Sequence, residues 1–160
     1  MRRLISGTLV VVALGFQVNA EGTVPFKATW SGVTVAADLS NFPIVAVVAS
    51  GQGEATEFGR FTMVSPHLNN VFTFELWGTQ NFTAANGDTL TASFSGRLTP
   101  HPDGSLSGTL PCVITGGTGR FAGAAGEYDF TITAVPLADG SGFASTATIE
   151  GDISSVGSLK

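Results

Sequence analysis

Charged residues are scarce in this chain of 160 residues: they make up 12% of it, against 43% hydrophobic residues. Only 7 residues are Lys or Arg, against 12 Asp and Glu, and the net charge is −5. The basic residues form no cluster, which argues against binding to nucleic acid or to an anionic lipid surface. No window of helical length has apolar residues spaced by three and four, so amphipathic helices are not expected.

Cysteine and histidine are almost absent. Cys112 is the one cysteine, so the chain forms no internal disulfide. Leu110 and Ile114 share its face at strand spacing, which predicts a buried thiol that acts as a small hydrophobic group. His67 and His101 are the two histidines, and neither has a metal-ligand type of neighbour at useful spacing. The sequence therefore predicts no metal site and no cofactor.

The first twenty residues have the pattern of a secretory signal peptide. Arg2 and Arg3 precede an apolar stretch over residues 4–16, and small residues at Val18 and Ala20 precede Glu21. The apolar stretch is shorter than the roughly 20 residues of a spanning helix. We expect cleavage after Ala20, a single domain over 21–160 with no membrane span, and a secreted or periplasmic location. With 5 basic residues against 12 acidic ones, that domain has a net charge of −7.

Apolar and polar residues alternate along most of the remaining chain, which predicts half-buried β-strands. In residues 89–98, for example, Leu90, Ala92 and Phe94 share one face while threonine and serine occupy the other. The same period predicts further strands in residues 71–77, 127–135 and 143–153. Residues 44–48 are apolar throughout, which favours a strand covered on both faces.

Turn residues separate these strands. Asn86-Gly87 is a strong hairpin signal, and residues 103–104 and 139–142 resemble it. Consecutive hairpins predict an all-β fold: a closed, antiparallel, up-and-down barrel of about eight strands. A two-sheet sandwich is the alternative fold. An outer-membrane barrel is a further alternative, but two Trp and one Tyr cannot form aromatic girdles.

Residues 115–126 contain five glycines between two expected strands. Glycine permits positive φ and close backbone approach, so a tight, packed corner is expected. The Lys-Ser/Thr pair of a phosphate-binding loop is missing. Arg120 is expected to bind a carboxylate such as Glu57 or Glu127 and so to hold the corner. The residues assigned to turn and corner motifs are Asn86, Gly87, Gly116, Gly117, Gly119, Arg120, Phe121 and Gly123.

Three stretches, residues 53–62, 82–91 and 114–126, resemble the allene oxide cyclase barrel-like proteins and their dirigent relatives, in particular their bacterial secreted branch. The resemblance implies a calycin-like barrel of eight antiparallel strands, whose lumen holds a small apolar molecule. Plant members cyclise unsaturated fatty-acid epoxides, and dirigent members orient phenolic radicals. The matching positions are mostly turn and packing residues, so they imply the fold and not a chemistry.

Few residues are candidates for a site. Gln52 and Glu54 belong to a polar row that alternates with small residues. If this row faced the lumen, burial would raise the pKa of Glu54 and make it a candidate catalytic acid or base. The outward orientation is favoured, because a lone glutamate is rarely buried. Glu75 lies on a polar strand face, and Tyr128 lies on an apolar face where its hydroxyl needs a partner. These four residues are the ligand-binding candidates.

The leading hypothesis is a secreted barrel that binds a small hydrophobic ligand in its lumen. One alternative is a cyclase or isomerase that acts on an unsaturated small molecule. Another is a barrel filled by its own side chains, which acts through its surface. A homo-oligomer is compatible with each of these hypotheses.

Overall fold

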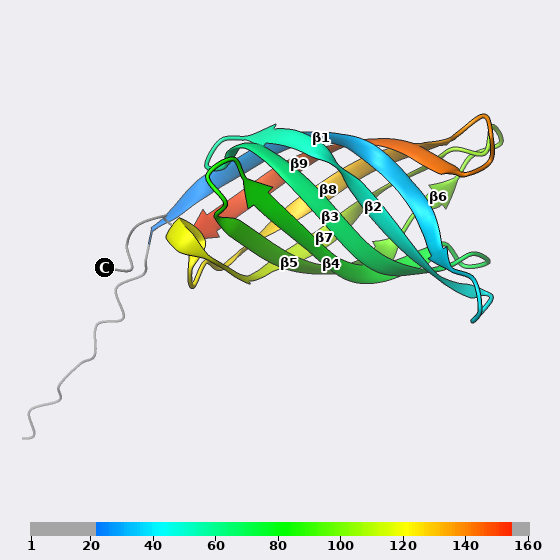
Figure 1. Cartoon of the computed structure of the whole chain (residues 1–160), viewed down its shortest axis with the longest axis horizontal. Coiled ribbons are helices and arrows are strands. Elements are labelled where there is room, and N and C mark those ends of the chain that lie inside the picture. The colour runs from blue at the N-terminus through cyan, green and yellow to red at the C-terminus, as the bar shows by residue number, and fades with distance from the viewer. Residues whose placement is uncertain (1–21, 155–160) are drawn as a thin grey trace, which may run out of the picture.

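Strands make up nearly all of the regular structure in the computed structural model, which describes residues 22–154 (Figure 1). The expected signal peptide, residues 1–20, lies outside the described residues. Within them, no helix has the length and apolar character needed to cross a membrane. The elements are β1 Thr23–Asp38, β2 Ile44–Ala55, β3 Gly59–Asn70, β4 Glu75–Ala84, β5 Thr89–Arg97, β6 Thr99–Pro100, β7 Leu106–Gly117, the 3₁₀ turn η1 Gly119–Phe121, β8 Gly126–Pro136 and β9 Gly142–Ser154.

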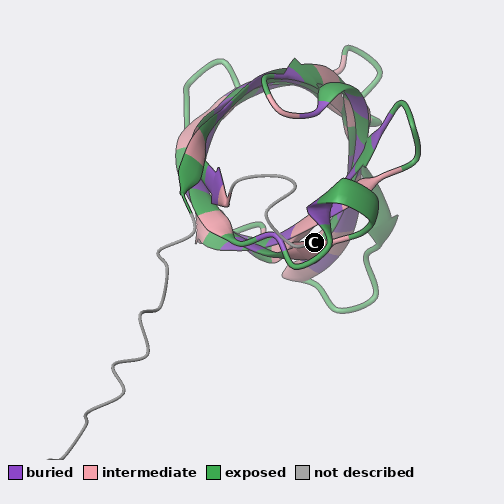
Figure 2. Ribbon diagram, turned by 90° about the vertical axis from the view of Figure 1, so that its left-hand side faces the viewer, coloured by how far each residue is buried: buried purple, intermediate pink, exposed green. Residues whose placement is uncertain are grey.

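The eight long strands form a closed antiparallel barrel. Strands β1 to β5 pair in sequence order, β9 pairs with β1, and β7 pairs with β8, which pairs with β9. Pairing between β5 and β7, from Leu90 opposite Gly117 to Phe94 opposite Cys112, closes the ring. The two-residue β6 pairs only with β7. Seen along its axis, the ribbon is a continuous ring (Figure 2). The predicted fold class is confirmed, and the sandwich alternative is not.

The alternation in sequence becomes an inner and an outer face. Leu90 and Ala92 are fully buried, and Tyr128, Phe130 and Ile149 are nearly so, while the threonines between them are mostly exposed. Buried and exposed positions alternate along the strands in Figure 2. Cys112 is also buried, as its apolar neighbours predict. Because every long strand has two neighbours, burial of one face stabilises the ring without leaving an unpaired edge.

Aromatic rings fill the end of the barrel that carries η1, which we call the closed end. Phe58 and Phe121 stack with ring centroids 4.2 Å apart, and Phe82 packs edge-on against Phe26, Phe58 and Phe61. Tyr128 packs edge-on against Phe26 and Phe82. Such edge-to-face pairs each add to the stabilisation that area burial gives. The closed end is therefore a packed aromatic core.

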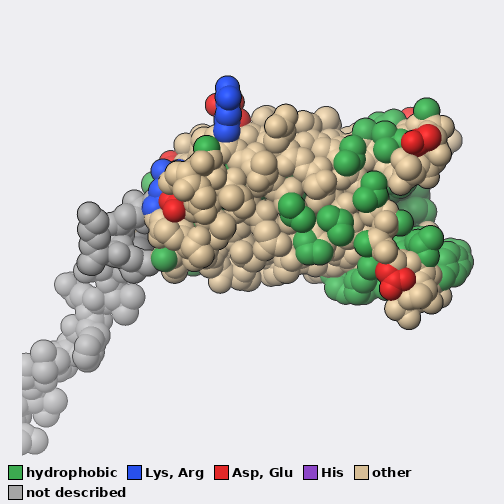
Figure 3. Space-filling view, viewed as in Figure 1, with side chains coloured by type: hydrophobic (Ala, Val, Ile, Leu, Met, Phe, Trp, Pro, Cys, Tyr) green, Lys and Arg blue, Asp and Glu red, His purple; other side chains and the backbone are tan. Residues whose placement is uncertain are grey.

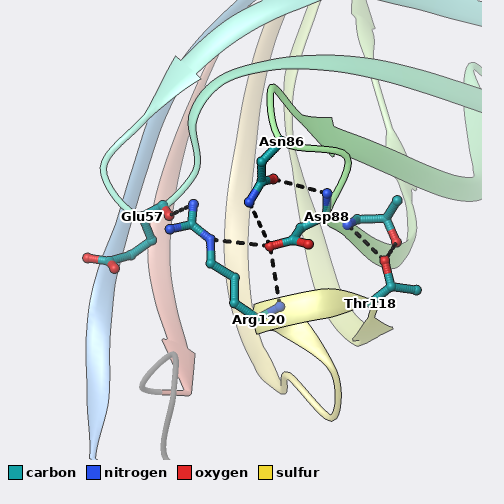
Figure 4. Close-up of polar contacts among 6 residues, drawn as sticks. Glu57, Asn86, Asp88, Thr118 and Arg120 are labelled. Carbon is teal, nitrogen blue, oxygen red and sulfur yellow. Dashed lines mark hydrogen bonds and ion pairs between the residues drawn. The ribbon is translucent and has the colours of Figure 1, made fainter.

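The glycine-rich corner covers this end as expected, but Arg120 binds a different carboxylate. Its guanidinium lies 3.8 Å from Asp88 and donates a hydrogen bond of 2.8 Å to the backbone carbonyl of Glu57, not to its carboxylate (Figure 4). The expected partners, the carboxylates of Glu57 and Glu127, form no ion pair with it among residues 22–154. Asn86 donates to the Asp88 carboxylate, and the same carboxylate accepts from the backbone N–H of Arg120, which links the hairpin at Gly87 to η1.

Glycine is required at two positions of this corner. Gly87 has φ +91° in the β4–β5 turn, and Gly119 has φ +59°. A Cβ atom on Gly119 would overlap the Asp88 carboxylate. Phe121 is buried beneath the corner, and three further glycines of the motif shape the backbone beside it: Gly116, Gly117 and Gly123.

Two strand predictions need correction. Residues 71–74 are a turn and not a strand, because Phe74 has φ +58° and Asn70 caps Phe72 and Thr73 with its side chain. Phe72, expected on the apolar inner face, is 68% exposed. The second correction concerns residues 44–48, which are not covered on both faces. Val45 and Val47 are buried in the barrel, and the residues between them are partly exposed.

The core position of Phe82 and the surface position of Phe72 predict different losses of stability when each residue is replaced by alanine. Phe82→Ala should lower the free energy of unfolding by about 3–5 kcal/mol, because it leaves a cavity among packed rings. Phe72→Ala should change it by about 1 kcal/mol or less, because Phe72 lies on the surface and packs edge-on against Phe42, which is also exposed. Urea unfolding monitored by circular dichroism measures both values. Equal losses would contradict the placement of these two rings.

Candidate functional site

The opposite end of the barrel, which we call the mouth, contains a cavity. The mouth is formed by the β1–β2, β3–β4 and β8–β9 connections and by the segment between β5 and β7. The cavity has a volume of about 60 Å³. A single water needs roughly 10–15 Å³ of such cavity volume, so the cavity holds several waters or a small organic group. It is lined by residues of every long strand: Trp30, Thr34, Ala49, Met63, Ser65, His67, Asn69, Leu76, Gln80, Phe94, Leu98, Leu106, Leu110, Phe130, Ile132, Ala134, Phe143 and Ser145.

Strand β3 places a polar row inside the mouth half of the lumen. Ser65, His67 and Asn69 line the cavity and follow the apolar Phe61 and Met63 on the same inner face. On the outer face of the same stretch, Val64 and Leu68 are exposed to solvent. The usual pattern of apolar inside and polar outside is thus inverted over half of this strand. Such local departures from a consistent pattern are expected at functional sites.

Three polar atoms of the cavity wall have no hydrogen-bond partner among the described residues: Trp30 Nε1, Asn69 Oδ1 and Ser145 Oγ. Trp30 and Ser145 are 3% and 4% exposed. An unsatisfied buried polar group costs about 1–3 kcal/mol, and native proteins contain few of them.

Trp30 and Ser145 lie close to each other. The Cζ2 atom of Trp30, on the Nε1 side of the indole ring, lies over Gly32, and Ser145 is the β9 residue directly opposite Gly32. A side chain on Gly32 would displace the indole, so glycine at this position allows the ring to lie flat along β1. Two unsatisfied groups on neighbouring strands therefore face the same cavity.

His67 is held in one orientation. Its Nδ1 lies 2.9 Å from the carbonyl oxygen of Ser65, and its ring packs edge-on against Phe94. Burial lowers the pKa of His67 more than this hydrogen bond raises it. The imidazole is thus neutral at pH 7, with Nδ1–H donating to Ser65 and Nε2 left as an acceptor.

A small polar network forms the floor of the cavity. The Tyr128 hydroxyl donates a hydrogen bond to Oε1 of Gln80, and the Cys112 thiol lies 3.9 Å from the same oxygen. Gln80 is 1% exposed. Burial raises the pKa of Cys112 to about 12 and the pKa of Tyr128 well above its ordinary value. Both groups are neutral, so this network offers no thiolate or phenolate nucleophile.

Of the four ligand-binding candidates from the sequence, only Tyr128 lies inside the barrel. Gln52, Glu54 and Glu75 are exposed on the outer face, so they do not line the lumen. Gln52 and Glu54 instead border a shallow outer hollow of about 780 Å³, beside threonines of β1, β8 and β9. Glu54 is therefore solvated, and none of the described residues that line the lumen cavity carries a carboxylate.

The sequence reasoning overlooked the residues that do line the cavity. His67 follows Pro66, a residue that is rare inside strands, yet both lie within β3. The alternation that starts at Phe61 continues through Met63 and Ser65 to His67 and Asn69, and this was the available signal. Nothing local in the sequence indicates that Trp30, Ser145 and β3 meet across the lumen.

The cavity combines a mostly apolar wall with a few hydrogen-bonding groups. No cluster of three or more His, Cys, Asp or Glu residues suited to a metal ion occurs in residues 22–154. No model of a known protein family matches the sequence, and no curated protein matches it. The geometry of the lumen is consequently the main guide to function.

Stability should depend on pH through His67. The unfolded chain binds a proton near the ordinary pKa of 6.5, while burial keeps His67 neutral in the folded state to lower pH. The folded protein should therefore lose stability as the pH falls from 7.5 to 5.5, whereas His67→Gln removes this component. Urea unfolding at several pH values measures the slope.

The control for this prediction is His101→Gln, which alters an exposed histidine in the connection that precedes β7. This variant should retain the slope of the wild-type protein. If His67→Gln also keeps the full wild-type slope, the placement of His67 in the lumen is wrong.

Proposed function

We propose that this protein binds a small, largely apolar molecule in the mouth half of its lumen, with a polar group of that molecule bound near Trp30 and Ser145. The observation that carries this proposal is the pair of buried, unpartnered polar atoms that face one cavity. A bound molecule with a hydrogen-bonding group removes the penalty that these atoms carry.

The contrast between the two ends supports binding over a purely structural role. The closed end is filled by six aromatic rings, which shows that the same barrel can pack its interior. The mouth half instead keeps Ser65, His67 and Asn69 where apolar side chains would pack. Apolar residues such as Phe94, Leu110 and Phe130 supply the remaining wall. A mostly apolar wall with a few convergent polar groups is typical of small-molecule sites.

The volume of the cavity limits the size of the ligand. Pockets for drug-sized molecules measure about 300–1,000 Å³, far above the 60 Å³ found here. The ligand is accordingly a molecule built around one ring, or a longer molecule that inserts one end. A cyclase or isomerase is less well supported, because Glu54, the one catalytic candidate from the sequence, lies outside the barrel.

The proposal also includes a location outside the cytoplasm and a distant family relationship. The signal-peptide pattern of residues 1–20 supports a secreted or periplasmic location. The eight-stranded antiparallel barrel supports a distant relationship to allene oxide cyclase barrel-like and dirigent proteins. A fold shared by many proteins carries no activity by itself, so the ligand must be found by experiment.

Titration with benzyl alcohol tests the proposed site. The chain has two tryptophans, Trp30 in the lumen and Trp77 on the outer surface, so a ¹⁵N-labelled sample gives two indole N–H signals. Benzyl alcohol should shift the Trp30 signal and leave the Trp77 signal in place, with a Kd on the order of 1 mM for so small a probe. Ala134→Val, which narrows the cavity, should weaken binding by about tenfold.

Ala144→Leu is the matched control, because it adds volume on the outer face of β9 beside Ser145. It should bind the probe as the wild-type protein does. If the Trp30 signal stays unmoved up to the solubility limit of benzyl alcohol, or if Ala134→Val binds as well as the wild type, the proposed site is refuted.

A further inference from the structure

The wall of the mouth cavity contains no charged side chain. None of its lining residues is Asp, Glu, Lys or Arg, and its histidine, His67, is neutral because it is buried. An ionised ligand group that enters such a site loses its hydration and finds no counter-ion. Transfer of an unpaired ion out of water is among the most costly steps in binding.

The unpartnered atoms require both a donor and an acceptor. The indole Nε1–H of Trp30 can only donate, Oδ1 of Asn69 can only accept, and the Ser145 hydroxyl can do either. A hydroxyl group can accept from one of these atoms and donate to another. A carboxylate can accept from both Trp30 and Ser145, but it has no proton to donate to an acceptor such as Oδ1 of Asn69.

The connections around the mouth are acidic. Asp38 lies at the end of β1, Glu75 starts β4, and Asp103 and Asp139 lie in the turns before β7 and β9. Short hydrogen bonds from Ser40, Ser105 and Ser141 lower the pKa values of the three aspartates, so they are ionised at pH 7.

The basic residues lie mostly at the other end. Of the Lys and Arg residues in the described part of the chain, Lys27, Arg60 and Arg120 belong to the closed end, and only Arg97 is near the mouth. Arg97 donates to the carbonyl of Thr73 and stands opposite Glu75 on the neighbouring strand. In Figure 3, Lys and Arg atoms gather toward the closed end, where acidic atoms also lie, while the mouth shows hydrophobic and acidic groups.

The field at the mouth therefore opposes anions. Charges at the entrance of a cavity act through a low-dielectric surrounding and alter the local concentration of charged ligands. The effect decreases over a Debye length of about 8 Å at physiological ionic strength, so it weakens with added salt.

We propose that the lumen selects its ligand by charge: it takes an uncharged molecule with a hydroxyl group and rejects the carboxylate of the same size. This inference rests on the proposed function, because it concerns the same cavity. It adds a chemical class to that proposal, a small neutral alcohol, and excludes fatty or aromatic acids bound as anions.

Three probes with one aromatic ring and different charge test the inference at pH 7: benzyl alcohol, benzylamine and benzoate. Their Kd values come from the shift of the Trp30 indole signal, with Trp77 as the internal reference. Benzyl alcohol should bind tightest, and benzoate should bind at least about tenfold more weakly, because it is both unpaired in the cavity and repelled at the mouth. The Kd of benzylamine should lie between those of the other two probes. The acidic residues at the mouth attract its ammonium group, but the cavity provides no counter-ion for it.

Two sets of variants separate the contribution of the cavity wall from the contribution of the acidic residues at the mouth. Ser145→Ala should weaken the binding of benzyl alcohol several-fold. It should leave the binding of toluene, which has no hydroxyl, unchanged. The double variant Asp103→Asn and Asp139→Asn, in which the amide oxygen can still accept the serine hydrogen bonds, should bind benzoate better and benzyl alcohol as before. Raising the salt concentration should likewise reduce the difference between the two probes.

The outcomes are distinguishable. If benzyl alcohol binds and benzoate binds equally well or better, the selection by charge is wrong and the lumen site stands. If benzoate alone binds, the selection is also wrong. If no probe moves the Trp30 signal, the proposed function and the selection both fail.

Discussion

Closure of the sheet is the constraint on which the rest of the structure depends. Hydrogen bonding between β5 and β7 removes the last free edge, so one face of every long strand must point into a common interior. That interior has a fixed size for eight strands, and it must be filled by side chains or by something that enters from outside. The closed end uses Phe58, Phe82, Phe121 and their neighbours to fill it. The mouth half has smaller and more polar residues and leaves a cavity.

The two ends of the barrel differ in packing and in the polarity of the side chains inside them. The closed end combines stacked rings with the Arg120–Asp88 pair at the glycine-rich corner. The mouth combines unsatisfied buried atoms with acidic turns. A barrel selected only for stability would have apolar residues in place of Asn69 and Ser145, because each unpaired buried group lowers the free energy of unfolding. The neutral ligand that we propose would supply hydrogen-bond partners for them.

Most of the fold could be predicted from the sequence because period-2 alternation and turn residues are local signals. Residues 89–98 and 127–135 form strands with the predicted faces, and Asn86-Gly87 forms the predicted hairpin. Residues 71–74 were assigned wrongly, because alternation also arises in a turn whose Phe72 points to solvent. The site was harder to predict, because alternation alone does not show which face of a strand points into the barrel. The polar row with Glu54 lies outside and the row with His67 lies inside, and only pairing across the barrel distinguishes them.

The central claim is that the closed end is packed while the mouth half remains open around Trp30 and Ser145. A high-resolution crystal structure tests this claim most directly. The account predicts electron density for water or a bound molecule within hydrogen-bonding distance of Trp30 Nε1 and Ser145 Oγ, and continuous side-chain packing around Phe82. A lumen in which Leu106 and Phe143 fold inward to fill the space, with both polar atoms bonded to protein groups, would contradict it.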